Sequence, residues 1–253
     1  MSTSVPGELA GLVVAAGAGS RLRPLTRLRP KTLCPVANVA LVDHAMARVQ
    51  PLVTEVAVNV HHDADQVAEH LAGRAHLSHE VEQALGTAGA VGLLRPWIDG
   101  RGLLVVNGDA WTPTSLVPLV EGWDGETLRV AVAWPEPLGA GAPVAGALLP
   151  PAEVARLAPV PSGLWGTSWR PALAEGRLET VNLDGPFVDC GTPGDYLRAN
   201  LLASGGESVV GDDAVVEGEL VRSVVWPGAR VEEGERLVDA IRADRQGMTV
   251  LVR

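Results

Sequence analysis

The chain has 253 residues, of which 20 are basic and 30 are acidic, and its formal net charge at neutral pH is -10. This length accommodates one large domain and a small appendage. The acidic balance argues against a nucleic-acid polymer as a partner, because no basic stripe is available to neutralise its phosphates. The two cysteines do not form a disulfide framework, and neither a signal peptide nor a long apolar run is present. We therefore expect a cytoplasmic protein that does not cross a membrane.

Short apolar runs alternate with helical patterns along most of the chain. Such alternation predicts an α/β fold, with a mainly parallel sheet and helices on both faces. Ligands of such sheets bind at the carboxyl ends of the strands, where we expect Gly17, Glu82, Asn107 and Asp109 to converge. The expected strands are residues 12–16, 55–60, 75–82, 102–106, 128–133 and 144–149. The expected helices are residues 41–53, 63–71, 87–95, 114–121, 165–174 and 195–203, with threonine caps on the third and fourth.

The first expected strand runs into a glycine- and arginine-rich segment that ends at Lys31, the only lysine of the chain. Gly17 and Gly19 allow a sharp turn that presents backbone N–H groups to an anion. A dinucleotide-binding turn would need a third glycine where Leu22 stands, and the Gly-Lys-Ser/Thr of a Walker A loop is absent. Because an ammonium in such a loop is typical of phosphate binding, Lys31 is the first catalytic candidate.

Positive charge is concentrated in this segment, which carries Arg21, Arg23, Arg27, Arg29 and Lys31. A small anionic ligand is therefore compatible with the acidic chain as a whole. We expect Arg27 and Arg29 to be solvated surface residues.

Residues 14–26 (VAAGAGSRLRPLT) and 30–36 (PKTLCPV) together resemble the signature of the sugar-1-phosphate nucleotidylyltransferases. Further matches follow in the order of that family, at residues 85–89 (LGTAG), 105–109 (VVNGD) and 188–193 (VDCGTP). The resemblance implies a Rossmann-like catalytic domain of the nucleotide-diphospho-sugar transferase type over residues 1–205. The LGTAG segment looks like the mannose-1-phosphate guanylyltransferase branch. Residues 105–111 and 173–178 look like the N-acetylmuramate 1-phosphate uridylyltransferase branch.

The resemblance implies an enzyme of the EC 2.7.7 type, which makes a nucleotide sugar and pyrophosphate by in-line attack at the α-phosphorus. Lys31 and Arg21 are then catalytic, Lys31 on the transferring α-phosphoryl group and Arg21 on the leaving pyrophosphate. Asp109, also catalytic, and Asp189 match the two aspartates with which the family binds Mg²⁺. The best match for the substrates is GTP with mannose 1-phosphate. UTP or dTTP with another hexose 1-phosphate is also compatible.

Glu82 and Gln83 are the candidates for recognising the base. Glutamate accepts hydrogen bonds from guanine, whereas glutamine suits uracil or thymine. On a strand the two side chains would face opposite sides, so the base depends on which one points inward. The expected nucleotide-binding residues are Ala15, Ala16, Gly17, Gly19, Ser20, Glu82, Gln83, Gly86, Thr87, Gly89 and Asn107.

The sugar pocket departs from the family pattern. Family members carry a second lysine, in a Glu-Lys-Pro type segment, that binds the sugar 1-phosphate, whereas residues 133–138 of this chain read AWPEPL. Arg170 or Arg129 could replace that lysine, and Gly146 is placed near the sugar. The departure would suit a catalytically weak or inactive regulatory relative that binds nucleotide sugar. Retention of Arg21, Lys31, Asp109 and Asp189 together favours catalysis.

The texture of the sequence changes after residue 205. Val225, Val231 and Leu237 are six residues apart, as are Gly228 and Gly234. This period predicts a short left-handed parallel β-helix over residues 206–253, and a pair of hairpins is the alternative. In the resembled family such an appendage packs against the catalytic domain or a second subunit, so a homo-oligomer is an expectation as well.

Overall fold

The structure is a computed structural model that describes residues 9–133, 137–245 and 248–252. The chain forms two compact units. Among the described residues, no helix has the length and apolar character needed to cross a membrane. Unit 1 consists of Met1–Gly17, His44–Gly108 and Thr112–Phe187, and unit 2 consists of Ala18–Asp43, Asp109–Trp111 and Val188–Arg253.

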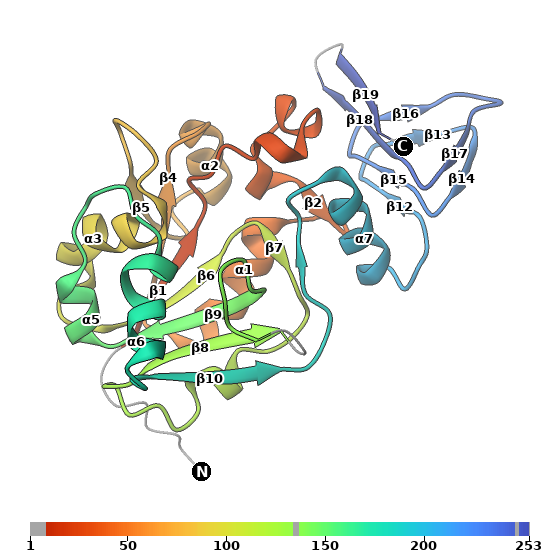
Figure 1. Ribbon diagram of the computed structural model, residues 1–253. Coiled ribbons are helices and arrows are strands. Elements are labelled where there is room, and N and C mark those ends of the chain that lie inside the picture. The colour runs from red at the N-terminus through yellow and green to blue at the C-terminus, as the bar shows by residue number, and fades with distance from the viewer. Residues whose placement is uncertain (1–8, 134–136, 246–247, 253) are drawn as a thin grey trace. The chain divides into compact units, whose positions relative to one another are not determined.

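Unit 1 is built on a seven-stranded sheet (Figure 1). Its strands are β1 (Leu9–Val14), β4 (Glu55–Val60), β5 (His76–His79), β6 (Gly102–Asn107), β8 (Leu128–Ala133), β9 (Val144–Leu149) and β10 (Leu178–Leu183). They lie in the order β10-β8-β9-β6-β1-β4-β5, and neighbours pair in parallel except at β9, which is antiparallel to β6 and β8. The expected mainly parallel sheet is thus confirmed.

Helices cover both faces of this sheet. On one face α3 (Gly86–Ile98), α5 (Pro151–Arg156) and α6 (Arg170–Ala174) share a buried core with alternate residues of β1, β6, β8 and β9. On the other face α4 (Val117–Val120) lies against Gly146 of β9, and Val49 of α1 (Leu41–Val49) lies against Gly11 of β1. A further helix, α2 (Ala64–Leu71), stands between β4 and β5 in the chain. The central strands β1, β6 and β9 are buried almost throughout, so their sequences are nearly continuous apolar runs, whereas the edge strands β5 and β10 are partly exposed and contain polar residues.

Some local expectations were wrong. Strand β5 ends at His79 rather than at residue 82, because Glu80 turns into the interior of unit 1, where it is 3% exposed. Neither threonine caps its helix: Thr87 accepts a hydrogen bond from the backbone N–H of Leu164, and the hydroxyl of Thr114 donates to the carbonyl of Asp184. The sequence also did not reveal α5 or β10, since neither shows a clear periodicity.

Unit 2 gathers short elements around one helix. Helix α7 (Pro193–Ala203) begins after Thr192, whose hydroxyl accepts a hydrogen bond from the backbone N–H of Asp195, and proline at the first helical position fixes its start. Two small antiparallel ladders lie in the same unit, β2 (Pro35–Val36) with β3 (Val39–Ala40) and β7 (Ala110–Trp111) with β11 (Val188–Asp189). The second of these ladders joins chain segments that are far apart in sequence.

The C-terminal residues of unit 2 form parallel pairs of short strands. The register joins Val209 to Val224 and then to Ile241, so the repeat is 15 and 17 residues long. This parallel pairing excludes ordinary hairpins for the first six strands and is compatible with a β-helix, whereas the last two strands form an antiparallel hairpin. The strands are β12 (Val209–Val210), β13 (Val215–Val216), β14 (Glu219–Val221), β15 (Val224–Val225), β16 (Arg230–Val231), β17 (Arg236–Val238), β18 (Ile241–Arg245) and β19 (Met248–Val252).

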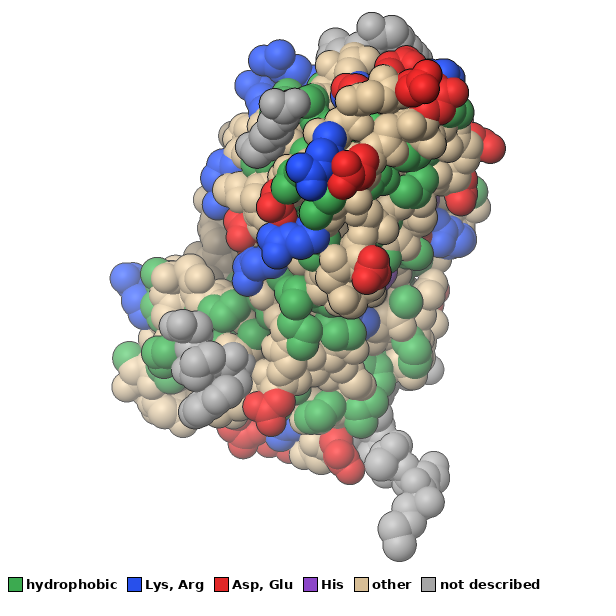
Figure 2. Space-filling view, turned by 90° about the vertical axis from the view of Figure 1, so that its right-hand side faces the viewer, with side chains coloured by type: hydrophobic (Ala, Val, Ile, Leu, Met, Phe, Trp, Pro, Cys, Tyr) green, Lys and Arg blue, Asp and Glu red, His purple; other side chains and the backbone are tan. Residues whose placement is uncertain are grey.

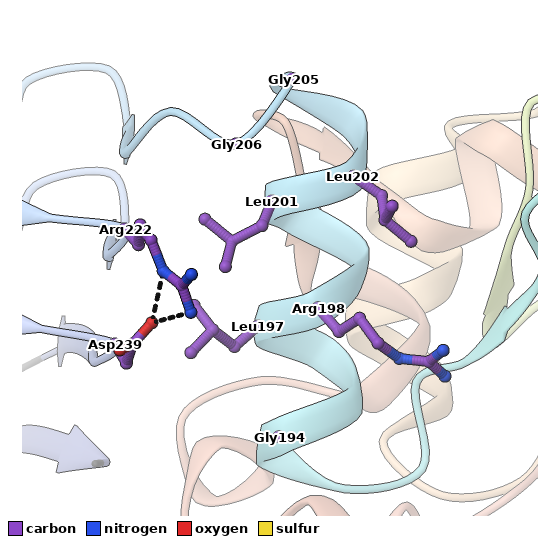
Figure 3. Close-up of a pocket in the computed structure, with 9 residues that line it drawn as sticks. All are labelled: Gly194, Leu197, Arg198, Leu201, Leu202, Gly205, Gly206, Arg222 and Asp239. Carbon is purple, nitrogen blue, oxygen red and sulfur yellow. Dashed lines mark hydrogen bonds and ion pairs between the residues drawn. The ribbon is translucent and has the colours of Figure 1, made fainter.

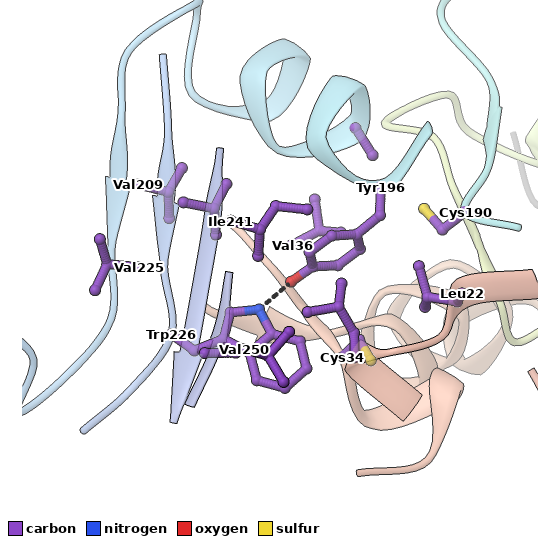
Figure 4. Packing of buried hydrophobic residues seen from close by; sticks show 14 of the residues in the cluster. Leu22, Cys34, Val36, Cys190, Tyr196, Val209, Val225, Trp226, Ile241 and Val250 are labelled. Atoms are coloured by element: carbon purple, nitrogen blue, oxygen red, sulfur yellow. Dashed lines mark hydrogen bonds between the residues drawn. The ribbon is translucent and has the colours of Figure 1, made fainter. Parts of the chain in front are cut away.

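A buried aromatic pair forms the centre of unit 2 (Figure 4). The indole N–H of Trp226 donates to the Tyr196 hydroxyl at 2.9 Å, and that hydroxyl donates to the carbonyl of Pro35. The guanidinium of Arg29 lies over the Trp226 ring, 4.5 Å from its centre. Arg29 is therefore not the solvated residue that we expected, whereas Arg27 is exposed. We call the strands from β12 to β19 the C-terminal coil. This C-terminal coil packs directly against the segment that contains Lys31.

Side chains of both charges lie close together on the upper part of the face shown in Figure 2, where Lys and Arg stand beside Asp and Glu. Several charged side chains of unit 2 form exposed ion pairs, such as Arg230 with Glu217. Exposed pairs of this kind contribute little to stability. The stability of unit 2 therefore comes mainly from its buried apolar centre.

We predict that Trp226→Ala lowers the free energy of unfolding by about 3–5 kcal/mol, because it removes a fully buried indole and the contact with Arg29. Chemical denaturation monitored by circular dichroism measures this change. The matched control is Trp165→Ala, at a half-buried position of unit 1, which should cost less. A loss below about 1 kcal/mol for Trp226→Ala would contradict the central role of this side chain.

Candidate active site

Lys31 lies between two carboxylates of unit 2. Its ammonium Nζ donates to Oδ2 of Asp109 at 2.7 Å and to Oδ1 of Asp189 at 3.2 Å. The lysine side chain is only 6% exposed, whereas the two aspartates are 37% and 54% exposed. Burial lowers the pKa of Lys31, but the charges and hydrogen bonds of Asp109 and Asp189 raise it more, so the pKa lies above its ordinary value. The ammonium is therefore kept charged while one side of the cluster remains open.

Short backbone ladders bring these groups together. Strands β7 and β11 pair Asp189 with Ala110, and the backbone N–H of Cys190 donates to the carbonyl of Asp109 at 3.2 Å. Lys31 begins a 3-10 turn over Lys31–Leu33. Gly19 lies against its stem with a φ of 60°, and a Cβ there would lie 2.8 Å from Cβ of Lys31. Glycine is thus required at residue 19 both by the backbone conformation and by the close approach of Lys31.

Arg21 stands at the edge of the same cluster. One guanidinium nitrogen lies 3.5 Å from Oδ2 of Asp189, and the arginine side chain is 71% exposed. A pair this long and exposed is weak, so the guanidinium is free to bind another anion. Gly191 lies beneath it, since a Cβ there would lie 3.0 Å from the guanidinium. Of the expected catalytic and metal residues, the structure therefore brings Lys31, Arg21, Asp109 and Asp189 together.

The strand ends of unit 1 carry a second set of polar groups. The backbone N–H of Ala15, directly after β1, donates to Oδ1 of Asn59 at 2.8 Å. Asn107 ends β6 and pairs in register with Val14. The backbone N–H of Gly108 donates to the carbonyl of Val14 at 2.9 Å. The turn after β1 is thus fixed to both neighbouring strands.

The expected base-recognition residues lie in a loop. Glu82 and Gln83 follow the end of β5 and are exposed, so they do not occupy opposite faces of a strand as expected. Gly86 and Gly89 of α3 pack closely against the segment around Ser162. A Cβ on Gly86 would lie 2.6 Å from the carbonyl oxygen of Ser162, and one on Gly89 would lie 2.4 Å from that of Val160. These two glycines therefore have a packing role in unit 1.

The expected sugar-binding residues lie in different environments. Gly146 faces Leu116 and Leu119 within the core of unit 1. Arg129 is the second residue of β8 and pairs with Glu179, and its side chain is 12% exposed. Arg170 is exposed at the start of α6. Of residues 133–138, in which the family lysine is missing, residues 134–136 lie outside the described part of the chain.

Asn59 and Glu80 are buried polar residues at the strand ends that the sequence analysis did not single out. Asn59 Nδ2 donates to Oε1 of Glu80 at 2.7 Å, and the backbone N–H of Leu85 donates to Oε2 at 2.6 Å. Asn59 is 1% exposed and Glu80 is 3% exposed. The available signal was an asparagine inside the apolar run of residues 55–60, because a polar residue buried in a strand needs a partner.

A hollow of about 460 Å³ lies along α7 in unit 2 (Figure 3). Leu197 and Leu201 project from the helix toward Arg222 and Asp239, whose side chains form an ion pair at 2.6 Å. The volume is sufficient for a small ligand. However, its walls are largely apolar and both of its arginines are paired, Arg222 with Asp239 and Arg198 with Asp195.

The carboxylates of the Lys31 cluster fit a divalent cation that also binds substrate. Among the residues that the structure describes, no group of three or more His, Cys, Asp and Glu side chains could hold a metal ion by itself. Asp109 and Asp189 both form ion pairs with the Lys31 ammonium, and both remain partly exposed. Mg²⁺ suits such a pair, because it commonly takes one or two carboxylates and completes its shell with phosphates and water.

The mainly parallel sheet and the Lys31 cluster define an α/β protein equipped to bind phosphate groups. A profile of the nucleotidyl transferase family matches residues 10–132. An N-acetylmuramate alpha-1-phosphate uridylyltransferase of Caulobacter vibrioides is 37% identical over 134 residues, which are 48% of this chain and 55% of the relative. A protein of the same name from Neisseria meningitidis is 36% identical over 108 residues, which are 40% of this chain and 47% of the relative.

A solved structure from Thermus thermophilus, described as a mannose-1-phosphate geranyltransferase, has the same fold. The TM-score is 0.71 over 97% of this chain and 95% of that chain, at 19% identity. The match to the nucleotidyl transferase family thus covers a little under half of the chain. The chain spans about half the length of the curated relatives that it matches.

Both cysteines lie beside the cluster and are free and buried. Burial raises the pKa of Cys34 to about 12 although Arg29 and Lys31 lower it, and burial also raises the pKa of Cys190. An unfolded chain would lose these protons near pH 9, whereas the folded protein retains them to about pH 12 for Cys34. Their contribution to stability is therefore complete below pH 9 and is lost as the pH rises toward 12.

We predict that Cys34 and Cys190 of the native protein resist iodoacetamide at neutral pH, because the thiolate is the reactive form and both thiols are buried and protonated. Mass spectrometry of tryptic peptides after timed alkylation measures the rate at each residue. The control is the same protein in guanidinium chloride, where both residues should react at least about a hundredfold faster. Equal rates in the two conditions would show that the thiols are accessible.

Proposed function

We propose that the chain is a sugar-1-phosphate nucleotidylyltransferase, which joins a nucleoside triphosphate to a sugar 1-phosphate. A phosphate oxygen of the sugar 1-phosphate attacks the α-phosphorus, and the bond from that phosphorus to the bridging oxygen breaks to release pyrophosphate. The observation that carries this proposal is the Lys31 ammonium held between Asp109 and Asp189. The reaction brings two anions together, so the protein must supply positive charge at the reacting phosphorus.

The described residues divide this task by their chemistry. Lys31 is a compact buried cation and is assigned to the α-phosphoryl group, where charge grows in the transition state. Arg21 is exposed and weakly paired, and its planar fork suits the departing pyrophosphate. The backbone N–H groups from Ala16 to Gly19 are assigned to the triphosphate. Support for these roles comes from the chemistry of the groups and from the match to the family motifs.

Asp109 and Asp189 are assigned to Mg²⁺, which would neutralise phosphate charge when bound. In the structure these carboxylates are already shared with Lys31. Lys31 and a divalent cation therefore compete for the same oxygens. Lys31 can turn toward a phosphate once its two carboxylates are compensated by another positive charge.

The substrates and the C-terminal coil complete the proposal. The names of the two bacterial relatives favour UTP and N-acetylmuramate 1-phosphate over the GTP and mannose 1-phosphate expected from the sequence. Glu82 and Gln83 do not decide between these bases, because both are exposed in a loop. We further propose that the parallel strand pairs that begin at β12 form a short left-handed β-helix, which the six-residue spacing of the buried side chains of Val225, Val231 and Leu237 supports.

A pyrophosphate-release assay over a panel of nucleoside triphosphates and sugar 1-phosphates tests the function. We predict turnover with at least one pair, and a decrease in kcat of about a hundredfold or more for Lys31→Ala, because a group that stabilises the transition state is removed. Arg27→Ala, an exposed arginine of the same segment, is the matched control and should retain full activity. The absence of turnover with every pair would favour the regulatory alternative, and unchanged turnover of Lys31→Ala would refute the role of the lysine.

Metal binding gives a second prediction, with effects of opposite sign. Mn²⁺ binding measured by electron paramagnetic resonance, without nucleotide, should weaken about tenfold or more in Asp109→Asn, because a carboxylate ligand is lost. Binding should strengthen in Lys31→Ala, because the competing ammonium is removed from the same oxygens. Asp184→Asn, at an exposed aspartate of unit 1, serves as the control and should leave binding unchanged. Weaker binding in Lys31→Ala would contradict the competition.

A further inference from the structure

A buried relay of hydrogen bonds crosses the carboxyl ends of three strands in unit 1. It runs from the backbone N–H of Ala15 to Oδ1 of Asn59 at 2.8 Å, from Asn59 Nδ2 to Oε1 of Glu80 at 2.7 Å, and from the backbone N–H of Leu85 to Oε2 at 2.6 Å. Ala15 follows β1, Asn59 lies in β4, and Glu80 follows β5. In the relay, each hydrogen-bond donor faces an acceptor, both at Asn59 and at Glu80.

The Glu80 side chain connects the two ends of the loop of residues 81–84. Glu80 precedes the loop and the backbone N–H of Leu85 ends it, so one carboxylate joins the two ends of the exposed residues 81–84. The backbone of Glu80 is itself fixed to β4, because its N–H donates to the carbonyl of Val60 at 2.9 Å and its carbonyl accepts from Nδ1 of His61 at 2.5 Å. The loop is therefore held at both ends while its side chains remain open to solvent.

Asn59 connects this loop to the turn after β1. Its amide accepts from Ala15 with one atom and donates to Glu80 with the other, so the positions of the two segments depend on each other. Ala16 and Gly17 in this turn are assigned above to the triphosphate, and Glu82 and Gln83 in the loop are the candidates for recognising the base. The relay thus lies behind both segments of unit 1 that the proposed function assigns to the nucleotide.

A buried carboxylate is a costly way to close a loop. The hydrogen bonds that the structure shows to the Glu80 carboxylate come from neutral amide groups, and the side chain is 3% exposed. Burying an ion costs several kcal/mol, which its hydrogen bonds must offset. Strand pairing alone would stabilise this part of the sheet, so this cost indicates a requirement for accurate placement of the attached loops.

We propose that Asn59 and Glu80 are positioning residues that hold the turn after β1 and the loop of residues 81–85 in one fixed arrangement for a nucleoside triphosphate. This inference rests on the proposed function. Neither side chain needs to touch the nucleotide, because the relay acts through the backbone of Ala15 and Leu85. Loss of the relay leaves two mobile segments that the nucleotide must order when it binds, and binding is weakened by that cost.

Because the relay needs an amide and a carboxylate, it can be tested by exchanging these two groups between residues 59 and 80. Glu80→Gln leaves one N–H group facing another, since glutamine has one acceptor where two are needed. Asn59→Asp places two carboxylates together. In the double variant Asn59→Asp/Glu80→Gln, the aspartate accepts from Ala15 and from the glutamine amide, and the glutamine oxygen accepts from Leu85. The double variant can therefore form all three hydrogen bonds again.

We predict that each single variant weakens binding of a fluorescent nucleoside triphosphate, and raises its KM, by about tenfold or more, with a much smaller change in kcat. The double variant should return to within about threefold of the wild type. Hydrogen exchange at the backbone N–H of Leu85 should accelerate in Glu80→Gln and become slow again in the double variant. Thermal unfolding of all four proteins separates effects on binding from effects on folding.

The outcomes distinguish this inference from the proposed function. If the wild type binds no triphosphate, the proposed function fails and the positioning role fails with it. If the wild type binds triphosphate and the single variants lose thermal stability but bind it equally well, the relay is structural only. A double variant that binds as weakly as the single variants would also overturn the inference.

Discussion

The ion cluster of Lys31 with Asp109 and Asp189 is the constraint on which the rest of unit 2 depends. A buried ammonium is unstable unless acceptors surround it, and these acceptors lie 78 and 158 residues away along the chain. Three segments must therefore converge on one point. The two-residue strands β7 and β11, the 3-10 turn at Lys31 and the left-handed conformation of Gly19 all follow from that requirement. Because the aspartates remain partly exposed, the cluster can exchange partners without unfolding.

The aromatic centre of unit 2 explains how such short elements hold their positions. A ladder of two residue pairs is too small to be stable alone, and the apolar cluster around Tyr196 and Trp226 supplies the missing burial. The hydrogen bond from Tyr196 to the carbonyl of Pro35 connects the residues after Lys31 to α7. Arg29, which precedes Lys31, lies over the ring of Trp226. The C-terminal coil is thus a structural support for the segment that contains Lys31.

The sequence predicted the parts of the molecule that depend on local pattern or on motif. Strands β4, β8 and β9 have the expected bounds, because each is a mainly apolar run, and Lys31, Asp109 and Asp189 were found through motifs and do converge. The sequence could not show the end of β5, because Glu80 is buried only through long-range partners. Likewise, β7 and β11 are too short to leave a pattern, and the environment of Arg29 depends on Trp226, which is distant in the sequence.

The charges of the cluster determine how easily Lys31 can exchange its carboxylate partners for an anionic ligand. Two cations, Lys31 and Arg21, face two carboxylates, so the group is neutral as the structure shows it. A triphosphate approaching such a group gains little while its aspartates hold the lysine, because each new contact with Lys31 gives up one already made. A ligand that arrives together with positive charge avoids this exchange, since Asp109 and Asp189 then keep a partner while Lys31 turns to phosphate. Under the proposed function, nucleotide and cation would therefore bind with positive coupling, with the shared lysine as the physical link between them.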